Sequence, residues 1–234
     1  MRFVMGRRQI GLGISAVLCI AALILSFRLT VDYRETIRQI GEMIIVIDPG
    51  HGGVDGGTRD AWGRLEKDIN LMLGKAIQRQ LTAGGMQVVM TREQDIALAP
   101  FTGRPGRHSR DLQERIRRAR QHQCLFLVSI HCDWSKDASE TGAKVFYHAG
   151  APESKQLALT IQEQLNRNQL RQRKAAPGKY FVIRQQGVIG VIVEVGFLSN
   201  PQEAQSLQEK AFQRQLALTV AQGILMHSRS YLSR

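Results

Sequence analysis

A glycine-rich loop that holds a single histidine is the first feature of the sequence that points to chemistry. The loop runs from Asp48 to Gly57 with the sequence DPGHGGVDGG and follows a run of apolar residues. Glycine allows the backbone to turn tightly, so the loop can fold around the imidazole of His51. A second histidine, His131, ends another apolar run in the sequence SIHCD. Because α/β sheets bind ligands beyond the carboxyl ends of their strands, we expect the two histidines to converge.

Two carboxylates complete the candidate site. Glu66 begins a long amphipathic helix, and with the two histidines it gives two nitrogen ligands and one oxygen, the ligand set of a catalytic zinc ion with a vacant water position. Glu194 ends the apolar run VIGVIV, where an ionised carboxylate is costly without a partner. Zinc lowers the pKa of bound water to about 7, and a nearby carboxylate can take the proton. We therefore interpret His51, Glu66 and His131 as Zn²⁺ ligands and Glu194 as the general base.

The other candidate ligands are interpreted as structural. Cys132 adjoins His131, but neighbouring strand residues point to opposite faces, so we expect a small core residue. Cys124 and Cys132 bracket one extended segment of roughly 26 Å at about 3.3 Å per residue, which is too long for a disulfide. Four histidines lie in polar or helical surroundings without a converging partner: His108, His122, His148 and His227.

The elements that must position these residues form one α/β domain over residues 43–234. Apolar runs predict strands at 43–47, 86–91, 124–131, 143–148, 180–184 and 188–195. Helical spacing predicts helices at 66–83, 112–121 and 153–165, and another from 201 to the C-terminus. Strands that alternate with helices indicate a mostly parallel or mixed twisted sheet of about six strands with helices on both faces.

The first forty residues predict a targeting segment. A basic region at 1–9 precedes an uncharged apolar run at 10–27. Eighteen helical residues span roughly 27 Å, close to a hydrocarbon core of about 30 Å, and no small-residue cleavage site follows. We expect a signal or transmembrane anchor at 10–27, a connector at 28–42, and an exported protein on the outer face of the cytoplasmic membrane. The alternative is a cleaved signal and a secreted protein.

The charge balance favours anionic partners. The chain has 32 Lys and Arg against 20 Asp and Glu, a formal net charge of +12. Acidic lipid and wall polymers are therefore candidates. Nucleic acid is excluded as a partner because no zinc finger, recognition helix or aromatic RNA-binding pattern accompanies the charge. The basic segment 104–120 is interpreted as a solvated helix face.

Several stretches together resemble the zinc-dependent N-acetylmuramoyl-L-alanine amidases of bacterial cell separation and sporulation. The resemblance covers residues 43–227 and rests on IVIDPGHGGVDGGT, the Glu66-Lys67 helix start, TREQD, Leu112 to Arg115, SIHCD and VEVGFLSNPQEA. It implies hydrolysis of the amide bond between N-acetylmuramic acid and L-alanine in peptidoglycan. It also implies that His51, Glu66 and His131 hold zinc and that Glu194 is the catalytic acid and base, as inferred above from the residues. The family usually has asparagine where this chain has Asp133, a departure that bears on how the substrate is positioned.

An anchor followed by a bare catalytic domain resembles the germination-associated amidases of the spore cortex. That resemblance implies a muramic acid product freed of its peptide, which a partner deacetylase can turn into a lactam. One alternative is a zinc carboxypeptidase that trims the stem peptide and holds its terminal carboxylate with a cation such as Arg184. Another is a catalytically silent wall-binding or regulatory module, against which the presence of all four expected residues argues.

Overall fold

Three neighbouring parallel strands bring their carboxyl ends together at one edge of the central sheet. The computed structural model describes residues 7–100, 102 and 105–232. For residues 7–17 and 37 it describes the backbone but not the side chains. The six strands lie in the order β2-β1-β3-β6-β4-β5, with β4 antiparallel to β6 and the other pairs parallel. They are β1 (Ile44–Pro49), β2 (Gln87–Met90), β3 (Phe126–Asp133), β4 (Lys144–Tyr147), β5 (Ala176–Pro177) and β6 (Ile189–Phe197).

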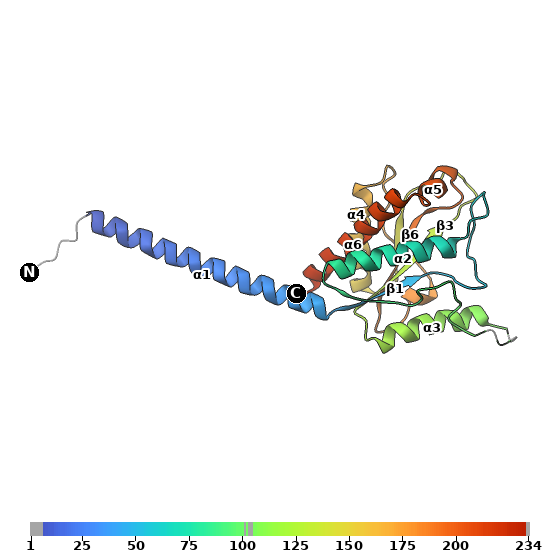
Figure 1. Ribbon diagram of the computed structural model, residues 1–234, viewed down its shortest axis with the longest axis horizontal. Coiled ribbons are helices and arrows are strands. Elements are labelled where there is room, and N and C mark those ends of the chain that lie inside the picture. Colours follow the sequence, from blue (N-terminus) through green and yellow to red (C-terminus); the bar gives the residue numbers. More distant parts are fainter. Residues whose placement is uncertain (1–6, 101, 103–104, 233–234) are drawn as a thin grey trace, which may run out of the picture. The chain divides into compact units, whose positions relative to one another are not determined.

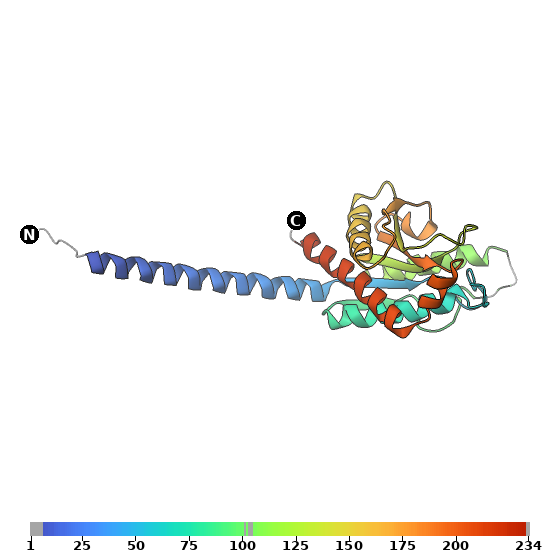
Figure 2. The same ribbon diagram turned by 90° about the horizontal axis from the view of Figure 1, so that it is seen from above.

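Alternate residues of each central strand pack into two separate cores. Ile45 and Ile47 of β1 belong to the larger core, which includes apolar residues of α2 (Glu66–Ala83), α4 (Pro152–Arg167) and α6 (Lys210–Leu232). Val46 belongs to the smaller core with α3 (Arg107–Gln121) and the 3-10 helix η1 (Phe181–Ile183). Figure 1 shows α3 on the opposite side of the sheet from α2, and Figure 2 shows the same layers from above. The expected mixed six-stranded sheet with helices on both faces is confirmed.

Two predicted elements were wrong. Residues 180–184 do not form a strand: η1 occupies Phe181–Ile183, and the sixth strand is instead the short β5. Val182 and Ile183 form a single helical turn and bury their side chains in the smaller core. A short apolar run in the sequence is compatible with either such a turn or a strand. The last helix is two helices, because α5 (Pro201–Ser206) ends before α6 begins at Lys210.

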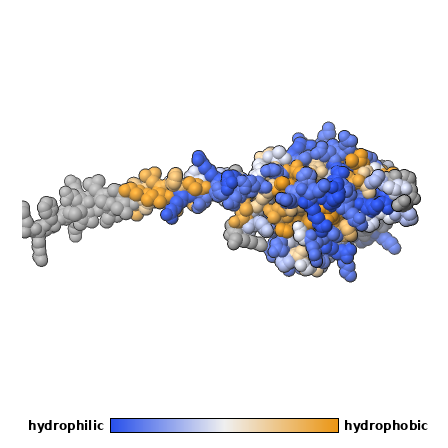
Figure 3. All heavy atoms as spheres, turned by 90° about the horizontal axis from the view of Figure 1, so that it is seen from below, coloured by the Kyte–Doolittle hydropathy of each residue, from blue (hydrophilic) through white to orange (hydrophobic). Residues whose placement is uncertain are grey.

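Residues 7–42 form one long helix, α1. The chain divides into two compact units, Met1–Gln39 and Ile40–Arg234. Helix α1 (Arg7–Glu42) includes the expected connector at 28–42, which is therefore helical. Figure 3 shows apolar side chains, in orange, on the first described part of α1, followed by hydrophilic side chains, in blue, toward its C-terminal end. No helix is long and apolar enough to cross a membrane when only the described side chains are considered. The predicted basic region at 1–9 and the first part of the predicted anchor, 10–17, lie outside the residues whose side chains the structure describes.

The structural roles expected for the cysteines are confirmed. All three are free, and Cys132 is buried in the larger core. His227 is also buried, with its ring 5.2 Å from that of Phe126. Cys132 and His227 are thus core residues beside the sheet, whereas Cys19 is exposed on α1.

Candidate metal centre and active site

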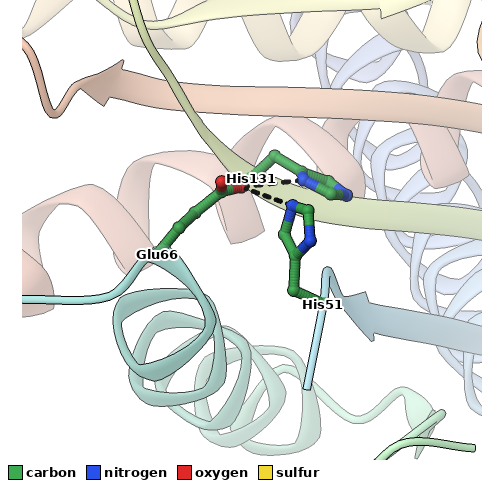
Figure 4. Close-up of side chains that lie close together, drawn as sticks. All are labelled: His51, Glu66 and His131. Carbon is green, nitrogen blue, oxygen red and sulfur yellow. Dashed lines mark hydrogen bonds and ion pairs between the residues drawn. The ribbon is translucent and has the colours of Figure 1, made fainter. Parts of the chain in front are cut away.

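The three predicted ligand side chains converge at the carboxyl edge of the sheet. His51 lies on the loop after β1, Glu66 begins α2, and His131 lies near the end of β3 (Figure 4). The Oε1 atom of Glu66 lies 3.2 Å from His51 Nε2 and 2.9 Å from His131 Nδ1. One ligand atom from each residue lies within 4.8 Å of the other two. Two imidazole nitrogens and one carboxylate oxygen, all possible metal ligands, therefore meet at one point.

A set of backbone and side-chain donors fixes the Glu66 carboxylate. The N–H and hydroxyl of Thr58 donate to Oε2 at 2.9 and 3.1 Å. The Cys132 N–H and the Asn70 side-chain amide donate to Oε1 at 3.1 and 3.2 Å. Burial alone raises the pKa of Glu66, but its hydrogen bonds and charge interactions with His131 and His51 outweigh it and hold the pKa far below its usual range. Glu66 is therefore ionised and held in a fixed orientation at neutral pH.

Asp55 fixes the orientation of the His51 ring, a role that the sequence did not reveal. His51 Nδ1 lies 3.0 Å from Asp55 Oδ1. An ionised carboxylate only accepts hydrogen bonds, so His51 donates at Nδ1 to Asp55, and Nε2 is the ring nitrogen that faces Glu66. Burial lowers the pKa of His51, but Glu66 and Asp55 reverse this effect and the pKa is raised. Asp55 thus holds the ring with Nε2, and not Nδ1, toward the centre of the site.

Two glycines leave the room that these side chains need. A Cβ atom on Gly50 would lie 2.2 Å from Nε2 of His131. Gly57 has φ +68°, and a Cβ atom there would lie 2.5 Å from Glu66 Oε2 and 2.7 Å from His51 Cδ2. His51 itself adopts φ 61°, a conformation that costs energy for a residue other than glycine and often occurs at functional sites. Larger residues at Gly50 or Gly57 would displace the ligands directly.

Two buried arginines support the backbone of the His51 loop. Arg115 forms an ion pair with Asp48 at 2.6 Å and donates to the carbonyl oxygens of Pro49 and His51 at 2.8 and 2.7 Å. Arg92 donates to the carbonyl oxygens of Pro49 and Gly50, both at 2.9 Å. The interpretation of the basic segment as a solvated face was therefore wrong for Arg115, which is only 2% exposed. Its partners come from distant parts of the chain.

Glu194 lies beside His131 on the neighbouring strand. The two residues are register partners of the parallel strands β3 and β6, so their side chains leave the sheet on the same face. Glu194 is 7% exposed, and its buried Oε2 has no hydrogen-bond partner within the part of the chain that the structure describes. Burial raises its pKa well above the usual value, and the negative charges of Asp133 and Glu66 raise it further.

One cavity of about 560 Å³ unites these residues. All three ligand side chains and Glu194 line it. His108 and Tyr180 also line it, so the interpretation of His108 as a structural residue without a converging partner was wrong. His108 Nδ1 lies 3.5 Å from Asp55 Oδ2. Burial, together with the charges of Glu194 and Asp133, raises the pKa of Tyr180 to about 12, so its phenol stays protonated.

Comparisons with known proteins agree with this site. The family model of N-acetylmuramoyl-L-alanine amidases matches residues 45–226. The germination-specific N-acetylmuramoyl-L-alanine amidase of Bacillus subtilis (strain 168) is 35% identical over 189 residues, which cover 79% of each chain. The CwlD amidase of Clostridioides difficile, solved in complex with the GerS lipoprotein, has a TM-score of 0.76 and 28% identity over 80% of this chain and 98% of that chain. An N-acetylmuramoyl-L-alanine amidase of Clostridium difficile 630 has a TM-score of 0.71 and 32% identity over 82% and 97%.

The chain is therefore an enzyme that hydrolyses peptidoglycan. It belongs to the N-acetylmuramoyl-L-alanine amidase family, because the family model covers more than half of its length.

Proposed function

We propose that this amidase is zinc-dependent and that His51, Glu66 and His131 hold the ion. The observation that supports the proposal is the convergence of two imidazole nitrogens and one carboxylate oxygen within 4.8 Å. This donor set is typical of a catalytic zinc site that leaves one position open. When bound, zinc acidifies water and polarises the carbonyl under attack.

In this proposal Glu194 is the general base and acid. Its raised pKa and unpaired, buried Oε2 suit a group that takes a proton from the attacking water. The water oxygen bonds to the lactyl carbonyl carbon of N-acetylmuramic acid, and the bond from that carbon to the alanine nitrogen breaks. Glu194 then gives its proton to the leaving nitrogen, so that L-alanine departs as a free amine. Asp55 keeps His51 oriented throughout.

We further propose that the enzyme is exported and acts on the outer face of the cytoplasmic membrane, anchored by residues 10–27 or secreted. The apolar composition of that segment supports an anchor. The similarity to a germination-specific amidase supports a role in the spore cortex. Cleavage there frees the carboxyl group of muramic acid, which a partner deacetylase can prepare for lactam formation.

The test is digestion of purified peptidoglycan by the full chain, with the released ends identified by mass. We expect free L-alanine amino termini, their loss with a chelator and their return with Zn²⁺. Glu194→Gln should retain zinc and lose roughly 10²- to 10⁴-fold in rate. Full activity in this variant would contradict the assignment of the base. Release of terminal D-alanine would favour a carboxypeptidase, and binding without cleavage would favour a silent module.

A further inference from the structure

A second groove opens beside the catalytic cavity. We call it the Trp134 groove; it measures about 720 Å³ and is lined by residues of the loops 57–65 and 134–138 with Leu198 and Ser199. It shares Thr58 and Trp134 with the catalytic cavity. Because Thr58 also donates two hydrogen bonds to Glu66, the groove begins directly behind a ligand of the candidate metal centre. The groove and the candidate metal centre are therefore adjacent spaces that meet at Thr58 and Trp134.

The charges of the groove are opposite to those of the cavity. The exposed side chains of Arg59 and Lys136 line the groove and form no hydrogen bond or ion pair with any residue that the structure describes. Its acidic lining residue, Asp60, is buried and pairs with Arg64 at 2.5 Å. Two uncompensated positive charges therefore face the groove. The catalytic cavity is instead lined by six carboxylates, of which Arg115 pairs with those of Asp48 and Asp111. The other four are those of Asp55, Glu66, Asp133 and Glu194, so the cavity has more acidic groups than arginines and lysines.

Trp134 offers an apolar surface at the junction of the two spaces. Its side chain is 49% exposed, so one apolar face of the indole is accessible to a ligand. Its backbone N–H donates to Asp133 Oδ1 at 2.8 Å and thereby fixes the start of the loop. The nearby Trp62 differs, because the Arg64 guanidinium covers its ring at 4.6 Å. The ring of Trp134 has no such cover among the described residues.

We propose that the Trp134 groove binds the acidic stem peptide of the substrate, with Arg59 and Lys136 pairing with its free carboxylates and Trp134 contacting its aliphatic atoms. The inference rests on the proposed cleavage between the glycan and that peptide. Charge decides between the two arms of the substrate: the stem peptide carries carboxylates along its length, whereas the sugar rings are neutral. The peptide thus occupies the basic groove, and the glycan leaves the cavity by another side.

The test is a ligand-detected NMR titration of the full, zinc-loaded chain with two peptides that lack the scissile bond. The probes are L-Ala-γ-D-Glu-L-Lys with a free α-carboxylate on its glutamate, and the same peptide with that carboxylate amidated. The wild type should bind the acid more tightly than the amide. The double variant Arg59→Gln/Lys136→Gln should weaken binding of the acid roughly 2- to 30-fold, as expected for two exposed ion pairs, and abolish the preference.

Two further variants separate the groove from general effects. Lys155→Gln/Lys210→Gln removes two exposed charges on α4 and α6, outside the lining of the groove, and should leave both affinities unchanged. Trp134→Ala should weaken both peptides alike, because the aliphatic contact does not involve the carboxylate.

The proposal is overturned if the wild type shows no preference for the acid, or if the preference survives in Arg59→Gln/Lys136→Gln. An equal loss in the lysine control would overturn it as well. The digestion of peptidoglycan gives an independent result on the same proteins. Groove-dependent peptide binding without release of L-alanine termini would refute the proposed bond cleavage alone, and release of those termini without groove-dependent binding would refute the groove alone.

Discussion

Replacing Arg115 by methionine removes the positive charge beneath the loop that presents His51. Arg115 is 2% exposed and pairs with Asp48 at 2.6 Å and Asp111 at 2.9 Å. The substitution leaves the buried Asp48 carboxylate with only Thr91 and Ser129 as side-chain donors. Breaking a buried pair from one side typically costs about 3 to 5 kcal/mol. We expect the free energy of unfolding to fall by that amount.

The assay is urea unfolding at pH 7 in the presence of a chelator, so that metal binding does not contribute. Arg117→Met is the matched control, because Arg117 pairs with Glu114 on the exposed face of the same helix. It should change the unfolding free energy by about 0 to 1 kcal/mol. Adding Asp48→Asn to Arg115→Met should restore part of the loss, since the unpaired charge is then gone.

The pH dependence of the deficit provides a second readout. Burial raises the pKa of Asp48, but Arg115, Thr91 and Ser129 outweigh it, so the folded pKa lies below the unfolded value of about 3.9. In the wild type this stabilisation is present above that value and is lost as pH falls through the folded pKa. Without Arg115, burial raises the folded pKa of Asp48 above its unfolded value. The difference in unfolding free energy between wild type and Arg115→Met should therefore become smaller as pH falls. A loss at pH 7 below about 1 kcal/mol, equal to that of Arg117→Met, would refute the reasoning.

Three other expectations follow from the site. Asp55→Ala should lower Zn²⁺ affinity about 10- to 100-fold in a competitive chelator titration, because the orienting partner of His51 is lost; an affinity within twofold of the wild type contradicts this role. Asp133→Asn should move the acid limb of kcat/KM to lower pH, since the charge of Asp133 raises the pKa of Glu194 and a base must be unprotonated; an unmoved or higher limb opposes the assignment. Zn²⁺ at about 100 times its Kd should stabilise the wild type by about 2.7 kcal/mol in calorimetry, and His51→Ala should abolish the gain; equal stabilisation of both proteins places the ion elsewhere.

The convergence of the ligand side chains was predictable because each belongs to a clear local pattern. His51 and His131 follow buried strands, and Glu66 begins an amphipathic helix, so strand ends and helix starts already indicate one edge of the sheet. Glu194 was found in the same way, as a carboxylate inside an apolar run. These features depend on residue spacing along a single element.

The supporting residues were not predictable because their roles depend on tertiary contacts. Arg115 lies in a strongly basic helix, and only its pairing with Asp48, 67 positions away, distinguishes it from its solvated neighbours. Asp55 is one polar residue of a loop whose path is set by glycines with positive φ. The turn at 181–183 was mistaken for a strand, because burial of a short apolar run does not depend on its backbone geometry.

The most direct test of the central claim is anomalous X-ray diffraction at the zinc absorption edge from crystals of the zinc-loaded chain. We expect one strong peak between Nε2 of His51, Oε1 of Glu66 and Nδ1 of His131, at about 2.0 to 2.2 Å from each. A zinc-loaded crystal with no peak at this position, or with its peak at other residues, would contradict the account.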